Sequence, residues 1–279
     1  MQQAGAPLGR HAGIVVRRGV MTGANDILVL RELEVRLGGL SRVRALGSRA
    51  EDDDFSAFIE SDCVRPLLRG TDIRAWQQNA TRHVIWLYDE HLRLRSPPRQ
   101  LARYLARHRE HLHGRAPNAP VGCLFRLSPA LLDSLVLWRD LSTELQAVAL
   151  PRAAAVRPVP LNSVYFLSPG RDDDAAFVLA AYLNSLPVRV FARTIAERAK
   201  DGFFRFFAWT IAVLPLAADW RGAHARELGA LSRVAHEQGS ADAGTRQRID
   251  TLVAHAYGLD EADIAVLSAF DRWLSGEHQ

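Results

Sequence analysis

Lysine and cysteine are nearly absent from this sequence. Of its 35 lysine and arginine residues, Lys200 is the single lysine, so arginine carries almost all of the positive charge. The two cysteines, Cys63 and Cys123, stand far apart and match neither a disulfide framework nor the spacing of zinc ligands. Because cysteine is among the residues most often buried, we expect both to be inert, reduced thiols.

Long apolar runs are also missing. The most apolar stretch, 203–216, is shorter than the roughly 18 residues that span a bilayer, and it contains Arg205. The amino-terminal residues 1–13 lack the apolar segment of a secretory signal peptide. These absences predict a soluble, cytoplasmic protein with no membrane partner.

The signatures of common catalytic and cofactor sites are absent as well. No G-x-G-x-x-G follows a strand, no Gly-rich loop ends in Gly-Lys-Ser/Thr, and no Gly-x-Ser-x-Gly nucleophile elbow occurs. Magnesium-dependent nucleases usually need clustered carboxylates near a lysine, and the spacing of Glu197 and Lys200 does not form such a pair. The sequence therefore predicts no catalytic residue and no cofactor-binding residue on this chain.

Three histidines form the best candidate for a metal site. His108 and His111 can share one face of a helix, with His113 close by, but no carboxylate or cysteine set accompanies them. We therefore expect a structural or surface role for all three, and no metal site is predicted.

What the sequence contains is typical of a folded protein. Its 279 residues suffice for a large core, and 48% of them are hydrophobic. The net charge of +4 does not identify a partner by itself, and codon usage alone can produce part of the arginine bias. Arginine nevertheless offers a planar fork suited to phosphates and guanine edges, which makes nucleic acid a leading candidate partner.

Strand signals are spread over the first two thirds of the chain. Leu33, Val35 and Leu37 alternate with charged residues, and this period of two predicts a half-exposed strand or hairpin. Branched and aromatic residues predict further strands in two later segments, 82–89 and 162–168.

A helix is predicted from Pro98 to a stop at Gly114, because Pro is tolerated in a first turn and Gly favours a helix end. Leu101, Tyr104 and Leu105 lie on its apolar side. The opposite side carries an arginine stripe, which we interpret as a solvated face. Its members are Arg99, Arg103 and Arg107.

A second helix is predicted to begin at the consecutive aspartates Asp172, Asp173 and Asp174. Acidic residues complement the dipole at a helix start, so we interpret this cluster as a cap rather than a metal site. Pro187 should kink or divide the helix. The following segment, 202–216, is predicted to be a loop and a strand.

The sequence changes character near residue 217. From Asp219 onward it is alanine-rich and helical, with one helix ending at Gly258 and the next starting at Asp260. We predict an α+β fold with an antiparallel-rich β core and peripheral helices over 1–217, followed by a small helical tail over 218–279.

The order of several short motifs resembles one known family. "RRGVMTGANDILVL" (17–30) is similar to a Gly-x-x-Thr-Gly-x-Asn-Asp entry, and "VRPLLRGTDIRAW" (64–76) to an Arg-Pro-x-x-Arg-Gly-x-Asp-Ile-x-x-Trp segment. A Pro-started helix, "LAAYLNSLPVRVF" (179–191) and the Leu-Pro ending "VLPL" follow in order. The chain resembles, over nearly its whole length, the TaqI-like target-recognition (specificity) region of adenine-specific DNA methyltransferases from restriction-modification systems.

This resemblance implies a specificity function without catalysis. Complete enzymes of the family carry a Gly-rich S-adenosylmethionine segment and an Asn-Pro-Pro-Tyr motif upstream, and neither occurs here. The chain is then either the carboxy-terminal part of a longer methyltransferase or a separate subunit that serves a catalytic partner. Its partners would be double-stranded DNA and that catalytic domain, which would bind the cofactor.

The residues expected to contact DNA lie in the first two motifs and in a third segment, "ERAKDGFFRFF" (197–207). In the first, Arg17 and Arg18 can reach phosphate, while Thr22 and Asn25 either contact base edges or hydrogen-bond their own turn. In the second, Asp72 is expected to pair with an arginine or cap a turn. The candidates are Arg17, Arg18, Thr22, Asn25, Arg69, Arg74, Arg198, Lys200 and Arg205.

A different function remains open from the residues alone. The phenylalanines of 203–207 cannot all face inward on one strand, so some are expected to be exposed or to touch a partner. The alternative is therefore a protein-interaction module, or an inactive fragment, that docks a catalytic methyltransferase or restriction subunit.

Overall fold

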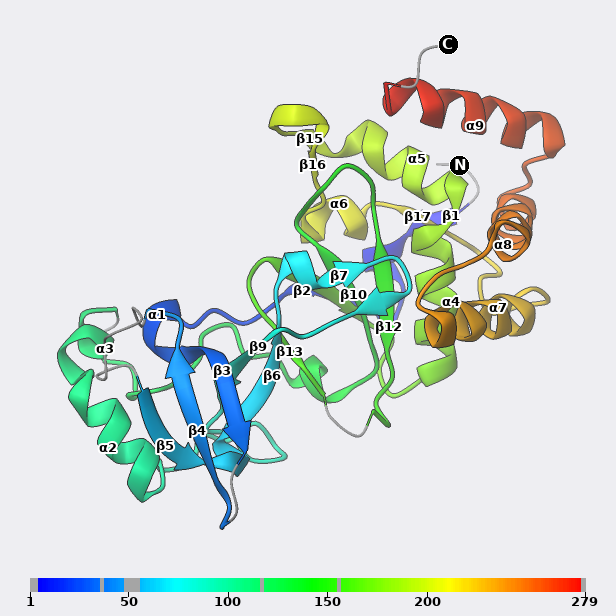
Figure 1. Cartoon of the computed structure of the whole chain (residues 1–279). Helices are drawn as coiled ribbons and strands as arrows, with labels where there is room; N and C mark the ends of the chain where they lie inside the picture. Colours follow the sequence, from blue (N-terminus) through cyan, green and yellow to red (C-terminus); the bar gives the residue numbers. More distant parts are fainter. Residues whose placement is uncertain (1–4, 36–37, 48–55, 116–117, 155–156, 277–279) are drawn as a thin grey trace.

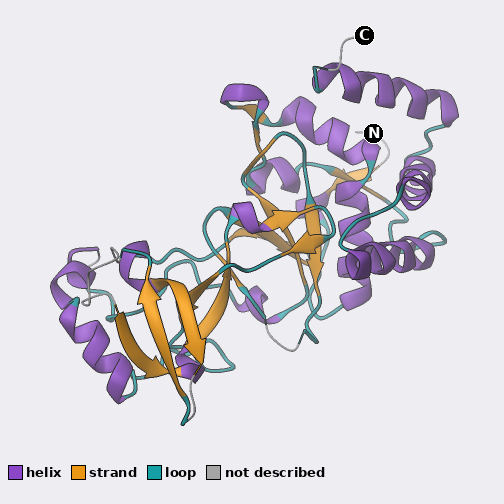
Figure 2. Cartoon of the chain, viewed as in Figure 1, coloured by secondary structure: helices purple, strands orange, loops and turns teal. Residues whose placement is uncertain are grey.

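A computed structural model describes residues 5–35, 38–47, 56–115, 118–154 and 157–276. Figure 1 shows a β-rich part around β3–β5 at one end and a helical part around α4–α9 at the other. Figure 2 shows that strands continue through the middle of the molecule, between these two ends. The predicted α+β class, with largely antiparallel sheets and helices at the carboxy-terminal end, is confirmed.

A six-stranded sheet forms the β-rich part. Its strands are antiparallel except for the parallel pair β13 and β6, and helix α2 (Arg99–Arg107) packs against β5. In spatial order the strands are β13 (Val159–Pro160), β6 (Val64–Leu68), β9 (Arg82–Ile85), β3 (Val29–Val35), β4 (Leu40–Ala45) and β5 (Ser56–Glu60).

A four-stranded antiparallel sheet forms the centre of the molecule, and both of its faces are buried. Side chains alternate between two hydrophobic cores: Trp138 and Tyr165 join the core beneath the helices, whereas Leu137 and Phe166 join the core of the β-rich part. The order is β12 (Ala147–Leu150), β10 (Leu135–Arg139), β14 (Val164–Ser168) and β2 (Val15–Arg18).

Smaller strands attach to these sheets. They comprise the ribbon of β1 (Gly5–Pro7) with β17 (Pro215–Ala217), the ribbon of β7 (Ile73–Arg74) with β8 (Gln77–Gln78), and a three-stranded sheet. The last consists of β11 (Leu141–Ser142), β16 (Phe204–Arg205) and β15 (Glu197–Arg198).

Helices cover one face of the central sheet. Helix α4 is buried along nearly its whole length, and α7 and α8 contribute Leu228, Ile249 and Leu252 to the same core. The helices after residue 217 are therefore not packed around a core of their own. The longer ones are α4 (Asp173–Asn184), α5 (Leu186–Ile195), α7 (Ala225–Gln238), α8 (Ala243–Ala256) and α9 (Glu261–Leu274).

Shorter helices link the strands. They are α1 (Asn25–Leu28), α3 (Arg109–Arg115) and α6 (Ala208–Ala212), with 3-10 turns η1 (Leu8–Arg10), η3 (Ser61–Cys63), η4 (Gly70–Asp72), η5 (Pro129–Leu132) and η6 (Lys200–Gly202). Within the described ranges, no single helix is long and apolar enough to span a membrane. The bent pair α4–α5, with 66° between its helices, is the one combination that has the length and composition.

Several sequence predictions are confirmed in detail. Asp172 caps α4 by accepting a hydrogen bond from the Ala175 amide at 2.9 Å, and Pro187 stands in the first turn of α5, where the helix divides. The hairpin predicted around Leu33 is β3–β4. Leu37 lies outside the described residues.

Two helix predictions need correction. The single helix expected from Pro98 to Gly114 is two helices, α2 and α3, because His108 leaves the helical conformation at φ −105° and ψ 17°. Segment 202–216, predicted to be a loop and a strand, contains the helix α6 between the short strands β16 and β17. One side of this helix is buried, because Ile211 joins the core, while Trp209 is exposed.

The outer edge of β12 is closed by side chains. The Asn184 amide exchanges two hydrogen bonds with the main chain of Ala147, both at 2.8 Å, and the Ala147 carbonyl also accepts from the Trp76 amide. The His236 ring accepts from the Ala149 amide through Nε2 at 2.8 Å and contacts the Ser232 carbonyl through Nδ1 at 2.6 Å. The main-chain groups of Ala147 and Ala149, which would otherwise be unpaired at the edge of the sheet, thereby find hydrogen-bond partners.

His236 should make the fold sensitive to acid. Burial lowers the pKa of its imidazole, so the neutral ring is favoured in the folded state, and the unfolded state binds more protons. The stability that it contributes is present above about pH 6.5 and is lost as the pH falls through the lowered folded pKa. We expect His236→Gln to flatten the dependence of the unfolding free energy on pH below neutrality, measured by urea unfolding. His255→Gln, at an exposed position, is the control, and equal slopes in both variants would contradict the assignment.

Replacing either of two glycines with alanine should change the stability of the protein in opposite directions. A Cβ at Gly229, inside α7, would make ordinary contact with Val178 at 3.5 Å, so Gly229→Ala should stabilise the protein by about 0.5–1 kcal/mol through helix propensity. A Cβ at Gly19 would lie 2.4 Å from the carbonyl oxygens of Pro160 and Leu161, so Gly19→Ala should cost about 1–3 kcal/mol. Urea unfolding measures both, and a tolerated Gly19→Ala would show that the close approach is not required.

Candidate nucleic-acid interface

Gly19 fixes the strand that carries the first two arginine candidates. Its close approach to residues 160–161 and the hydrogen bond from its amide to the Val164 carbonyl hold the end of β2 against β14. Successive side chains of a strand point to opposite faces, so Arg17 and Arg18 of the edge strand β2 lie on opposite faces of the central sheet. Arg17 is exposed, whereas Arg18 is half-buried.

Arg18 and Arg205 converge on one carboxylate although they come from distant parts of the sequence. Each guanidinium lies 3.9 Å from Oδ2 of Asp140. Arg18 also donates to the Asn162 carbonyl at 2.5 Å and lies over the ring of Tyr165. We call Arg18, Asp140, Tyr165 and Arg205 the Asp140 cluster.

Asp140 is held rigidly at the centre of this cluster. Its amide donates to the Ser163 carbonyl at 3.0 Å, and its carbonyl accepts from the Phe206 amide at 2.8 Å. Burial raises the pKa of its carboxyl group, and the two arginines oppose that rise. Oδ1 is buried and has no hydrogen-bond partner within the part of the chain described. The negative charge of this carboxylate is therefore balanced by the guanidinium groups of Arg18 and Arg205.

The β15–β16 ribbon presents two more candidates to solvent. Arg198, at the end of β15, and Lys200, at the start of the turn, are exposed; the turn passes through left-handed conformations at Asp201 (φ 58°) and Gly202 (φ 74°). The ribbon is anchored because Phe204 and Phe206 are buried in the core beneath the helices, while Phe203 and Phe207 stay half-exposed. The expectation that the four phenylalanines do not all face inward is confirmed.

Arg69 and Arg74 differ in how free they are. The Arg69 guanidinium binds both carboxylate oxygens of Asp72, at 3.1 and 3.3 Å, and also donates to Thr81. Asp72 thus pairs with an arginine, as predicted, and it also accepts from the Arg69 amide. Arg74 is exposed and donates only to main-chain carbonyls among the hydrogen bonds described, at 3.1 and 3.3 Å.

Arg139 connects these residues to the Asp140 cluster. Burial lowers the pKa of its guanidinium, and the positive charge of Arg74 lowers it further. Arg139 donates to Ser142 at 2.7 Å, and Ser142 pairs with Phe204 in the β11–β16 ribbon. The Gly70 amide donates to Ser163, beside the main chain of Asp140.

Thr22 and Asn25 lie in the turn before β3. Thr22 is buried, and its hydroxyl donates to the Asn25 side-chain oxygen at 2.5 Å and accepts from the Ala24 amide at 3.1 Å. Asn25 is exposed at the start of α1. These contacts match the alternative in which Thr22 supports its own turn. Asn25, which is exposed, is the residue of this turn that can present polar atoms to a partner.

The candidates therefore do not form one compact site. In Figure 1 their elements run from α1 through β2 and β7 to β15 and β16. Arg18 and Arg205 meet at Asp140, whereas the turn of Thr22 stands apart. Sequence reasoning missed Arg126, Arg139 and Asp140, which occur in no recognised motif. Arg126 is exposed at φ 59° and acts electrostatically on Tyr165.

The histidines and cysteines are placed as structural residues. His108 packs edge-on against Tyr104, His111 lies 3.4 Å from Asp26, and His113 accepts from Arg109. Both cysteines are buried, and burial raises the pKa of the Cys63 thiol to about 12. Among the described residues, no group of three or more histidines, cysteines and acids has the geometry of a metal site.

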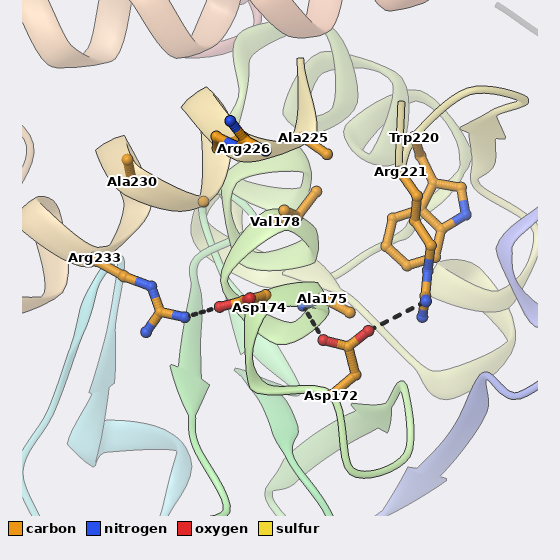
Figure 3. Close-up of a pocket in the computed structure, with 11 residues that line it drawn as sticks. Asp172, Asp174, Ala175, Val178, Trp220, Arg221, Ala225, Arg226, Ala230 and Arg233 are labelled. Carbon is orange, nitrogen blue, oxygen red and sulfur yellow. Dashed lines mark hydrogen bonds and ion pairs between the residues drawn. The ribbon is translucent and has the colours of Figure 1, made fainter. Parts of the chain in front are cut away.

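A cavity of about 520 Å³ lies between the start of α4 and helix α7 (Figure 3). Two of its arginines are paired: Arg221 lies 3.1 Å from Asp172, and Arg233 binds Asp174. Figure 3 shows Val178 and Ala175 between these pairs and Trp220 at one end. Both aspartates of the lining are thereby engaged, and Arg226 is its third arginine.

Comparison with known proteins adds no family assignment, because neither a scan of protein-family models nor a search of curated proteins returned a match. The geometry of the chain is therefore the basis for assigning its function.

The role of Thr22 can be tested by removing its hydroxyl. Thr22→Val keeps the shape but loses both hydrogen bonds of the turn, so we expect the free energy of unfolding to fall by about 0.5–1.5 kcal/mol. The ratio of affinities for duplexes of different sequence should stay unchanged in fluorescence-anisotropy titrations. Relaxed sequence preference at unchanged stability would instead assign Thr22 to base contact.

Proposed function

We propose that this chain recognises specific sequences in double-stranded DNA on behalf of an adenine-specific, S-adenosylmethionine-dependent DNA methyltransferase of a restriction-modification system. The observation that carries the proposal is the convergence of Arg18 of β2 and Arg205 of β16 on Asp140; Arg205 belongs to the β15–β16 ribbon, which also exposes Arg198 and Lys200. The resemblance of the motif order to the TaqI-like specificity region supports the same function.

The arginines divide into held and free groups, and both are useful for reading DNA. Arg18, Arg69 and Arg205 are oriented by carboxylates, which suits contacts that require defined geometry. Arg17, Arg74, Arg198 and Lys200 are exposed, which suits phosphate contacts that set register. Catalysis and cofactor binding belong, in this proposal, to a separate domain or subunit, because the required motifs do not occur in the sequence.

A second candidate function has its own observation. Helix α9 turns Val266, Phe270 and Trp273 to solvent, and the last two rings stack with centroids 5.5 Å apart. Exposed apolar side chains at helical spacing are typical of a protein-docking face. This face supports the alternative, in which the chain is a module that docks a catalytic subunit. DNA titrations separate the two functions, because a docking module would bind duplexes of different sequence equally or not at all.

Removing two free arginines should lower the salt dependence of DNA binding. For Arg17→Gln combined with Arg198→Gln, we expect the slope of log affinity against log salt to fall by about two units, since each phosphate contact contributes about 0.9. Anisotropy titrations of one duplex over a range of salt concentrations measure this slope.

The matched control removes two arginines from the α2 stripe, which lies on another part of the molecule. Arg99→Gln combined with Arg103→Gln changes the net charge equally, and both side chains are exposed. Its slope should equal that of the unmodified protein. Equal losses in both double variants, or no sequence preference in the unmodified protein, would contradict the proposed interface.

A further inference from the structure

A second cavity, of about 260 Å³, collects three arginines from three separate elements. They are Arg74 of β7, Arg189 of α5 and Arg246 of α8. The rest of its polar lining is Glu144, Gln146, Asn184, Ser240 and Asp250, and we call this cavity the arginine pocket. No motif of the sequence indicates it, because its members are spread over residues 74–250.

The charges around the arginine pocket leave an excess of positive charge. Glu144 is engaged by Arg189 and by Gln146, whose amide donates to it at 3.1 Å; Asp271 also lies 3.9 Å from Arg189. Asp250 accepts from the Leu186 amide at 2.7 Å. The lining therefore carries three guanidinium groups and two carboxyl groups, a formal excess of one positive charge.

Two of the three guanidinium groups keep donors for a ligand. Arg74 and Arg246 donate to main-chain carbonyls, Arg246 to Ala241 at 3.4 Å, and a guanidinium has five N–H donors in all. Such planar donors bind phosphate oxygens in pairs. The pocket therefore favours an anion with several oxygens over a cation.

The charge of the ligand favours a phosphomonoester over a DNA backbone. A phosphomonoester group carries up to two negative charges and three terminal oxygens, which several guanidinium donors can bind at once, whereas a backbone phosphodiester carries one charge and two such oxygens.

The wall of the pocket is rigid. Trp76 is buried at φ 68°, a conformation that bulky residues rarely adopt, and its amide is bonded to the Ala147 carbonyl at 3.0 Å. Asn184 of α4 fixes the same main-chain segment. A preformed wall lowers the ordering cost of binding.

We propose that the arginine pocket binds a small phosphomonoester, such as a sugar phosphate. The volume is below the roughly 300–1,000 Å³ of pockets for larger ligands, which limits the occupant to this size. The proposal rests on the geometry of the pocket. It shares Arg74 with the proposed DNA interface, whereas Arg189 and Arg246 belong to the pocket alone.

Isothermal titration calorimetry on the full chain tests the proposal with three probes. They are ribose 5-phosphate, inorganic phosphate and a DNA duplex without terminal phosphates. We expect ribose 5-phosphate to bind and to be displaced by inorganic phosphate, and the duplex not to displace it. Arg246→Gln should weaken ribose 5-phosphate binding about tenfold or more, through lost charged hydrogen bonds.

Two further variants keep the outcome interpretable. Arg103→Gln on α2 removes the same charge outside the pocket and should bind ribose 5-phosphate as the unmodified protein does. Ser240→Trp keeps all three arginines but puts a ring into the lining, and it should abolish binding while the unfolding midpoint without ligand is retained.

The proposal is overturned by either of two results. One is that Arg103→Gln and Arg246→Gln bind ribose 5-phosphate equally. The other is that the duplex displaces ribose 5-phosphate, which would make the pocket a site for backbone phosphodiesters. The salt slope measured with Arg17 and Arg198 does not involve this pocket, so the two proposals fail separately.

Discussion

The burial of the central sheet on both faces is the constraint on which the rest of the structure depends. Antiparallel sheets commonly leave one face to solvent, but β10, β12 and β14 send alternate side chains into two different cores. The sheet therefore joins the β-rich part to the helical part as a shared layer. Its edges have to be closed by other means, and Asn184, Trp76 and His236 do so along β12.

The candidate interface arises at the other end of the same sheet. β2 is the edge strand that leaves the shared layer, and Gly19 allows the chain to pass within van der Waals reach of residues 160–161. Asp140 follows β10 directly, and its main chain is bonded to Ser163 and Phe206. Arginines from β2 and β16 therefore meet at a carboxylate whose position is set by the sheet, and the same sheet that organises the cores orients the candidate DNA contacts.

Local features of the fold could be predicted from the sequence, whereas long-range convergence could not. Asp172 and Pro187 act on their own helices, so their roles follow from nearest neighbours. The meeting of Arg18 and Arg205 at Asp140 depends on strand order, which no local pattern encodes. Thr22 shows the same limit, because only tertiary packing determines whether a turn hydroxyl faces the core or a partner.

The compensation of charge also separates residues that look alike in the sequence. Arginines of the same motif end in different states: Arg69 is paired with Asp72 and donates to Thr81, while Arg74, five positions later, keeps free donors. A guanidinium tied to a buried carboxylate can present its remaining edge in one orientation, and that geometry is what base recognition requires. A guanidinium in solvent contributes charge without orientation, which is sufficient for phosphates. If the chain reads DNA as proposed, the distribution of acids among the arginines, rather than the number of arginines, sets which positions can carry sequence specificity.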